Sequence, residues 1–125
     1  MMEPRELANK IAEVLDNKGA IDIQILEVGH LTSITDFFVV CSGRNVQAVH
    51  TLAEDLEDHL AEMDILPRRK EGGNSAKWIV LDYAHVIVHI FHPEERQYYN
   101  IERLWQDGSN QLPFTPLDER PADAE

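Results

Sequence analysis

The sequence has a single cysteine, few basic residues and no long hydrophobic run. The lone Cys41 excludes an internal disulfide, and its apolar neighbours predict a buried thiol. The longest strongly apolar stretches, Phe37–Cys41 and Val86–Phe91, are far shorter than the roughly 20 residues that a membrane-spanning helix needs. Charged residues within the first six positions interrupt any apolar run, so we expect no signal peptide and a cytoplasmic protein.

Basic residues are outnumbered by acidic ones. The chain carries 23 acidic and 11 basic residues, which gives a formal net charge of −12. A negative surface repels phosphate and disfavours non-specific binding to nucleic acid, whereas it attracts a basic protein. Acidity that serves solubility alone is an equally open interpretation. The charge therefore excludes more functions than it identifies.

The rest of the composition is that of an ordinary folded domain. The 125 residues are 43% hydrophobic and 27% charged, which favours one domain that folds without disulfides. We expect this domain to cover residues 1–108. Residues 109–125 contain Pro113, Pro116 and Pro121 among several acids, and we predict that they form a flexible acidic tail.

Hydrophobic residues at helical spacing predict three helices. The first covers residues 4–18, and the second covers residues 46–63 with Asn45 as its N-cap. Pro93 begins the third, with acidic residues in its first turn. Four residues of this third helix are expected to pack onto a sheet: Tyr98, Ile101, Leu104 and Trp105.

Alternating or continuous apolar runs predict about five strands. They lie within residues 21–25, 35–41, 65–70, 77–82 and 85–91. The run at 35–41 is typical of a central strand covered on both faces, and Pro67 favours an edge position. The last two runs are joined by a very short connection and predict an antiparallel hairpin. We therefore expect an α/β (α+β) fold with a mixed sheet and flanking helices.

Patterns for metal binding or covalent catalysis are weak. His85 and His89 lie four residues apart on a predicted strand, roughly 13 Å from each other, whereas zinc ligands lie about 2 Å from the ion. We therefore expect no metal site, and we interpret His89 as a structural or interface residue. Cys41 lies in an apolar strand, where a thiol is more often part of the core than a nucleophile.

The predicted architecture also resembles that of nucleotidyltransferases, so a metal-dependent enzyme of that kind is the alternative function. Such enzymes follow a Gly-Ser turn with a spaced pair of acids that hold Mg²⁺. Here the turn is Ser42-Gly43, but no Asp-x-Asp follows it, and Asp82 alone is a poor two-metal site. We therefore expect neither catalysis nor a cofactor.

Aromatic and charged residues gather at the predicted hairpin. Trp78, Asp82 and Tyr83 lie close to Lys77 and to the glycine-containing loop at 71–75. Aromatic residues beside a charge are typical of protein interfaces. An equally open interpretation is that Trp78 and Tyr83 cap the core. The residues alone indicate an acidic α/β binding module.

Three ordered motifs are similar to those of the ribosomal silencing factor (RsfS/Iojap) family. The motifs are Thr35–Asn45, Trp78–Tyr83 continuing into Val86–Phe91, and a closing set formed by Arg96, Tyr99–Glu102 and Leu104-Trp105. The resemblance covers about residues 5–107. It implies a nucleotidyltransferase-like fold that lacks the catalytic acids.

The resemblance also implies a function. Members of this family bind the large ribosomal subunit through its protein fourteen, a basic β-barrel protein, and sterically block association with the small subunit. Translation is thereby repressed. We expect little direct nucleic-acid binding and no membrane contact, and a homodimer through the same surface is possible.

The resemblance assigns interface roles to residues around the hairpin. The expected contacts at the centre of the interface are Trp78, Leu81, Asp82 and Tyr83. The expected rim contacts are Lys70, Glu71 and Lys77. Asp36 and Ser42-Gly43 also match the family, but we interpret them as parts of the strand and turn architecture.

Overall fold

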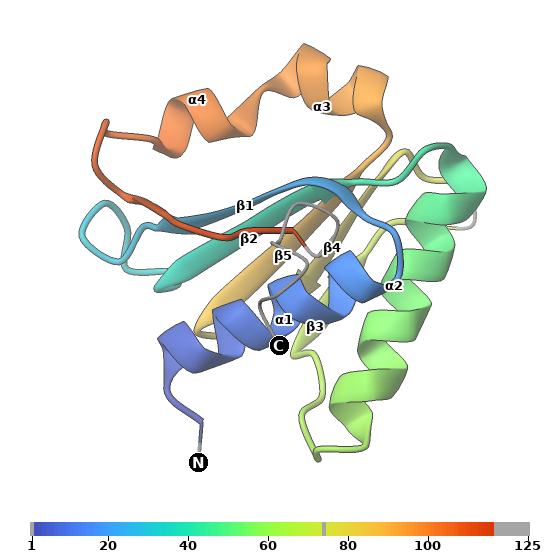
Figure 1. The fold of residues 1–125 in the computed structure, drawn as a ribbon, viewed down its shortest axis with the longest axis horizontal. Helices are drawn as coiled ribbons and strands as arrows, with labels where there is room; N and C mark the ends of the chain where they lie inside the picture. The colour runs from blue at the N-terminus through green and yellow to red at the C-terminus, as the bar shows by residue number, and fades with distance from the viewer. Residues whose placement is uncertain (1, 74, 117–125) are drawn as a thin grey trace, which may run out of the picture.

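The described part of the chain forms a six-stranded mixed sheet with two helices on each face (Figure 1). The computed structural model describes residues 2–73 and 75–116. The strands are β1 (Ile21–Glu27), β2 (Phe37–Ser42), β3 (Arg69–Glu71), β4 (Trp78–Asp82), β5 (Val86–Phe91) and β6 (Gln111–Leu112). The helices are α1 (Pro4–Asn17), α2 (Val46–Ala61), α3 (Pro93–Tyr99) and α4 (Ile101–Trp105).

The strands are ordered β3-β4-β5-β2-β1-β6 along the sheet. β2 runs parallel to β5, and the other neighbouring pairs are antiparallel. Along the chain, α2, β3 and β4 connect these two parallel strands, which are direct neighbours in the sheet. This arrangement confirms the predicted mixed sheet with flanking helices, including the β4–β5 hairpin, and adds one strand to the five expected.

Helices α1 and α2 cover what we call the first face of the sheet and enclose the larger core there (Figure 1). At the start of α1, Glu6 accepts a hydrogen bond of 3.0 Å from the Glu3 backbone N–H. At the start of α2, the Asn45 carboxamide oxygen accepts one of 2.8 Å from the Ala48 N–H, which confirms the predicted N-cap. The largest fully buried side chains of this core include Ile11, Leu15, Leu56, Leu60, Ile79 and Leu81.

β2 is buried along its whole length, as expected for a central strand covered on both faces. Its phenylalanines point to opposite faces, since Phe37 belongs to the first-face core and Phe38 to the second. The strand leads into Gly43, where an added Cβ would lie 2.8 Å from the Val49 backbone nitrogen. A glycine at this position therefore lets α2 begin close against the end of β2.

β1 differs from the simple alternation that its sequence predicts. A bulge between Ile21 and Gln24 shifts its register with β2, and Asp22 takes a positive φ of 52° there. Beyond the bulge, Ile25 and Leu26 are both fully buried, one in each core. The second half of the strand is thus covered on both faces, whereas Ile21 and Asp22 at its start are exposed.

Helices α3 and α4 lie on the second face, where sequence periodicity predicts one continuous helix. The chain breaks at Asn100, which adopts the left-handed conformation with φ 48° and ends α3. Ile101 is buried as expected, and Trp105 packs against the second core. The prediction that Tyr98 and Leu104 pack onto the sheet is wrong, because these residues are 79% and 76% exposed.

The segment after Gly108 also contributes to the sheet. Leu112 pairs with Ile25 of β1, and Phe114 packs against the first-face core. The start of the predicted flexible tail therefore adds an edge strand, which is too short to leave a hydrophobic pattern. Residues 117–125 of that tail lie outside the described residues.

Buried Arg96 connects the second-face helices to the sheet. Its side chain donates from Nη1 to Ser42 Oγ at 3.0 Å and from Nε to Glu102 Oε2 at 3.3 Å. The side chains of Arg96 and Glu102 are only 9% and 13% exposed. This network therefore joins α3, α4 and the end of β2 through charges that are largely withdrawn from water.

We expect Arg96→Ala to lower the free energy of unfolding by about 3–5 kcal/mol, because it leaves the Glu102 carboxylate buried without its partner. Replacing both charges, as Arg96→Met with Glu102→Leu, removes the unpaired charge and should recover most of this loss. Urea unfolding of the three proteins measures the difference. A double variant as unstable as Arg96→Ala would contradict the assignment.

Candidate protein-binding surface

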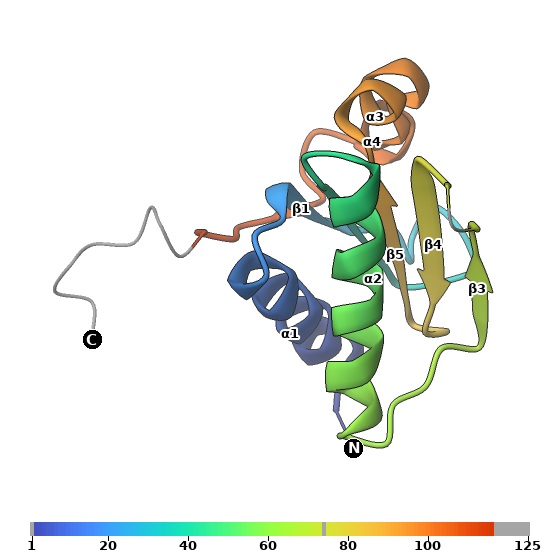
Figure 2. The same cartoon turned by 90° about the vertical axis from the view of Figure 1, so that its right-hand side faces the viewer.

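The second face of the sheet holds a cavity of about 210 Å³ beside α4, which we call the sheet cavity. Its floor consists of side chains from three neighbouring strands: Phe38, Val80, Ile87 and His89. Trp105 of α4 contributes one wall, and β3 contributes the charged part of the rim. In Figure 2, β3 forms the right-hand edge of the sheet, away from α3 and α4. The cavity therefore lies where these helices leave the sheet uncovered.

The loop of residues 28–36 forms the opposite wall through Thr32 and Ile34. Its two ends are closed by backbone hydrogen bonds from Val28 and Gly29 to the Asp36 carbonyl, at 2.8 and 3.1 Å. The carboxylate of Asp36 lies 2.8 Å from His85 Nδ1 in the β4–β5 turn. This wall is thus held to the hairpin that carries the floor.

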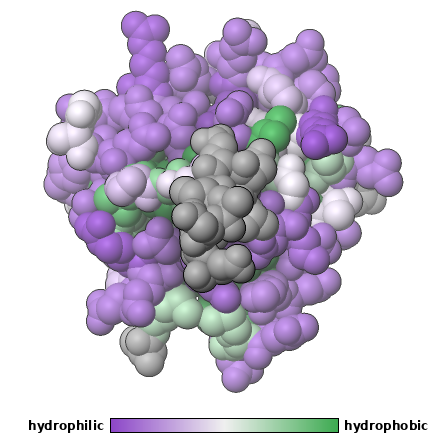
Figure 3. Space-filling view, in the orientation of Figure 1, coloured by the Kyte–Doolittle hydropathy of each residue, from purple (hydrophilic) through white to green (hydrophobic). Residues whose placement is uncertain are grey.

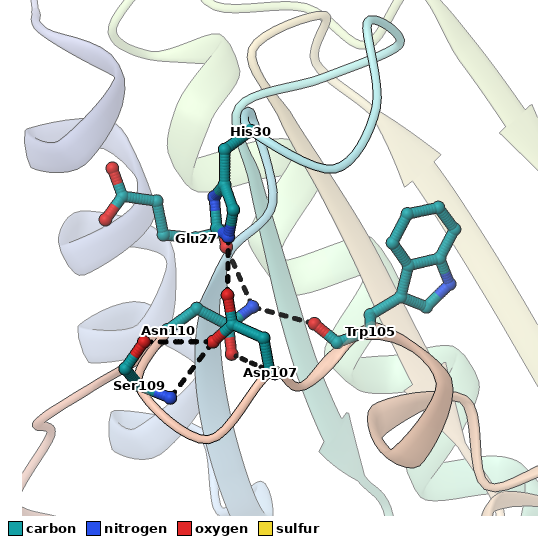
Figure 4. Close-up of polar contacts among 6 residues, drawn as sticks. All are labelled: Glu27, His30, Trp105, Asp107, Ser109 and Asn110. Carbon is teal, nitrogen blue, oxygen red and sulfur yellow. Dashed lines mark hydrogen bonds and ion pairs between the residues drawn. The ribbon is translucent and has the colours of Figure 1, made fainter.

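Buried Asn110 fixes the other wall (Figure 4). Its carboxamide donates to the backbone carbonyls of Glu27 at 2.9 Å and of Trp105 at 2.7 Å. Asp107, in the same turn, has its carboxylate 2.6 Å from His30 Nε2 of the 28–36 loop. Hydrogen bonds from His30 and Ser109 lower the pKa of Asp107 to about 2. One turn therefore positions Trp105 and contacts the loop across the cavity.

His89 on the cavity floor is held in its neutral form. Burial lowers the pKa of His89 to about 4, and its ring packs edge-on to Phe38 with centroids 4.9 Å apart. The Trp78 indole N–H donates to Nδ1 at 3.1 Å, so the neutral ring carries its proton on Nε2. Nε2 is buried without a hydrogen-bond partner among the described residues. The floor of the cavity is therefore uncharged.

Trp78 and Asp82 lie on the second face, beside or within this surface. Trp78 is half-buried and stacks on Phe91 at 4.7 Å, with Tyr99 5.0 Å away. Asp82 lines the cavity although it is 8% exposed, and Arg68 donates to its carboxylate at 3.0 Å. Both residues thus help to shape the surface, in addition to any contact that they make with a partner.

Leu81 and Tyr83 lie elsewhere, and we do not retain them as surface contacts. Leu81 is fully buried and Tyr83 is 6% exposed, both in the first-face core. Burial holds the pKa of Tyr83 well above its usual range. Side chains alternate along a strand, so Leu81 must point away from Trp78 and Asp82. That alternation, applied to the motif, could have separated these residues from the sequence alone.

The three expected rim residues are exposed but do not share one face. Glu71 lines the sheet cavity. Lys70, its neighbour on β3, donates to Glu57 of α2 at 2.8 Å and therefore belongs to the first face. Lys77 lies just before β4, and its carbonyl accepts from the His92 N–H at 2.8 Å.

The sequence did not predict that the 28–36 loop contributes to this surface. Ile34 carries no periodic signal because it lies outside any helix or strand, yet its side chain is 66% exposed at the wall of the cavity. Trp105 was expected only as a packing residue. Both are brought to the cavity by the strand order, which sequence periodicity does not reveal.

Asp36, Asp82 and Cys41 are each held within the fold. Asp36 pairs with His85 and Asp82 with Arg68, while burial raises the pKa of the Cys41 thiol to about 12. Across residues 2–73 and 75–116, no three His, Cys, Asp or Glu side chains are grouped so that they could hold a metal ion. None of the helices in these ranges is both long and apolar enough to cross a membrane.

The fold and its surface define a small α/β domain that carries an apolar cavity on an acidic molecule. A family model described as "Ribosomal silencing factor during starvation" (RsfS) matches residues 1–125, and the chain belongs to this family. It is 33% identical to the ribosomal silencing factor RsfS of Bacillus subtilis, over 94% of this chain and 96% of the relative.

More distant relatives and solved structures agree. A mouse protein named "Mitochondrial assembly of ribosomal large subunit protein 1" is 28% identical over 76% of this chain and 43% of its own length. A crystal structure of a Chromobacterium violaceum protein matches with a TM-score of 0.80 and 30% identity, covering 94% of this chain and 98% of that one. The predicted family and fold class are thus confirmed.

The depressed pKa of His89 predicts a stability that depends on pH. A histidine has a pKa of 6.5 when unfolded, so the lowered pKa of His89 has no effect on stability above pH 6.5, and up to about 3 kcal/mol is lost as pH falls through about 4. In His89→Asn the carboxamide oxygen can still accept from Trp78 but does not titrate. We expect this variant to lose less stability than the wild type between pH 7 and pH 4.5.

Urea unfolding at the two pH values measures this difference. His59→Asn, at the end of α2 on the first face, is the matched control and should keep the wild-type dependence. Equal pH dependence in His89→Asn and the wild type would show that His89 is not the group responsible.

Proposed function

We propose that this protein is a ribosomal silencing factor that binds the large ribosomal subunit through its protein fourteen. The bound protein would sterically prevent association with the small subunit and so repress translation. The observation that carries this proposal is the match of the whole chain to the silencing-factor family. The name of the mouse relative, which refers to the large ribosomal subunit, supports the choice of subunit.

The electrostatics of the chain support a protein contact over an RNA contact. A net charge of −12 opposes binding to ribosomal RNA and favours a basic ribosomal protein. On the side of the molecule seen in Figure 3, hydrophilic residues predominate and hydrophobic residues form only small areas. We propose that the protein acts in the cytoplasm as a regulator that blocks a surface and not as an enzyme.

We place the proposed interface on the second face of the sheet, around the sheet cavity. Trp78, Asp82 and Glu71 lie on this face, and we keep Lys77, exposed just before β4, as a proposed rim contact. Lys70 would contribute only through its backbone or by leaving Glu57, since its side chain is on the first face. The uncovered side of β3 and β4 is the part of this face that a partner could approach.

Sedimentation of purified ribosomal subunits through a sucrose gradient tests the proposal. We expect the protein to migrate with the large subunit and to reduce the joined-ribosome peak when small subunits are added. Small subunits alone are the control for non-specific binding. A protein that stays at the top of the gradient, with an unchanged joined peak, would refute the proposed function.

The proposed role of the acidic surface predicts an effect of charge on association. Glu71→Lys reverses an exposed charge at the rim and should slow association with the large subunit by roughly tenfold or less at low salt. Glu54→Lys makes the same change in net charge on the exposed side of α2 and is the matched control. Stopped-flow association kinetics would measure both rates.

Equal slowing by the two variants would contradict a specific contact at Glu71 and indicate an effect of net charge alone. The difference between the variants should also diminish at high salt, because the charges at issue are exposed to solvent.

A further inference from the structure

The size of the sheet cavity suits one side chain better than a cofactor. Its volume of about 210 Å³ exceeds the roughly 150 Å³ of a protein cavity that binds benzene. Sites for larger ligands have volumes of about 300–1,000 Å³. The cavity therefore has room for a single aromatic or branched aliphatic group.

The lining of the cavity favours an apolar group in its interior. Phe38, Val80 and Ile87 are apolar, and burial keeps His89 neutral, with Trp78 donating a hydrogen bond to its ring. An inserted charge would lose its hydration without gaining an opposite charge on the floor. An inserted hydrocarbon would lose water contact and gain dispersion contacts.

Glu71 on the rim can accept a positive charge beside this apolar group. Of the two carboxylates that line the cavity, Asp82 is already paired with Arg68 at 3.0 Å, so Glu71 is the one that a partner's cation could engage. Arg69 and Glu71 are 3.8 Å apart, and their side chains are 70% and 64% exposed. Such an exposed pair contributes little to stability, so Glu71 can pair with an incoming cation at small cost.

Ile34 adds exposed apolar surface beside the cavity. Its side chain stands 66% exposed on the 28–36 loop, directly beside the cavity, although the loop is held at Asp36 and His30. A group seated in the cavity would contact Ile34 from the side. It would thereby withdraw apolar surface of the protein itself from water.

We propose that the sheet cavity receives one large apolar side chain of a basic protein partner, with a neighbouring lysine or arginine of that partner placed against Glu71. The inference rests on the proposed function and names the chemistry by which that partner is recognised. In this arrangement the cavity and Ile34 bury the hydrocarbon, while Glu71 faces the cation. Trp78 donates to His89 Nδ1 and thereby orients that ring on the floor beneath the inserted group.

RNA fits this surface less well than protein does. A base inserted into the cavity would bring its phosphates to a rim where Arg68 and Arg69 only balance the two carboxylates, on a chain whose overall net charge of −12 repels a polyanion. The polar edges of the base would also meet a floor that offers mainly hydrocarbon. An apolar side chain from a basic protein meets neither obstacle.

Val80→Phe tests the cavity directly, because Val80 is half-buried on its floor and the larger ring would occupy the space. We expect this variant to lose affinity for purified large ribosomal subunits by roughly thirtyfold or more, as the loss of a central contact does. Val46→Phe, a half-buried valine at the start of α2, is the matched control and should bind as the wild type does.

Ile34→Asp is the second variant, and it tests the cavity even if Val80→Phe fails to fold. Its position is exposed, so the fold should tolerate the change, and the added charge beside the cavity should weaken binding by roughly tenfold or more. Circular dichroism and thermal unfolding verify that each variant is folded. Gradient sedimentation at several protein concentrations gives the affinities.

The possible outcomes separate this inference from the proposed function. Loss of binding by folded Val80→Phe and Ile34→Asp, with Val46→Phe unaffected, supports the cavity as the point of insertion. If the wild type binds large subunits and Ile34→Asp or a folded Val80→Phe binds with the same affinity, the inference is overturned and the proposed function stands. Failure of the wild type to bind large subunits overturns both.

Discussion

The pairing of buried Arg96 is the interaction on which the second face of the sheet depends. A guanidinium withdrawn from water must have its donors satisfied, and here Ser42 and Glu102 accept them from different elements. These contacts tie the short α3 and α4 to each other and to the end of β2, although helices of seven and five residues are too short to be stable alone. With α4 held there, Trp105 stands at the wall of the sheet cavity.

Much of the fold could be predicted because it follows from local patterns. Apolar periodicity indicated α1, α2 and the buried β2, and the hydrogen-bonding capacity of Asn45 indicated where α2 begins. The break between α3 and α4 could not be predicted in this way, since Asn100 adopts its left-handed conformation within a continuous helical pattern. Tyr98 before the break and Leu104 after it are both exposed, although the pattern of one continuous helix would place them with Ile101 against the sheet.

The candidate site was harder to predict because it belongs to the sheet order and not to one segment. A contiguous motif from Trp78 to Tyr83 suggested one surface, yet strand geometry divides its members between two faces. The cavity itself combines β2, β3, β4, β5, α4 and the 28–36 loop. Ile34 and Phe38 meet β4 across it only because β5 lies between β2 and β4 in the sheet.

The apolar cavity and the acidic charge of the chain have separate physical roles in the proposed recognition. Charge acts over distances near the Debye length, so it affects how often a basic partner arrives and how rarely an RNA does. The cavity acts only at contact, and burial of an apolar group there governs how long a partner stays. Because His89 is neutral, the floor does not oppose the attraction of a cation to Glu71, whereas a protonated ring would repel that cation. In the proposed recognition, specificity for a basic protein therefore requires both the acidic charge of the chain, with Glu71 exposed at the rim, and a floor that carries no charge of its own.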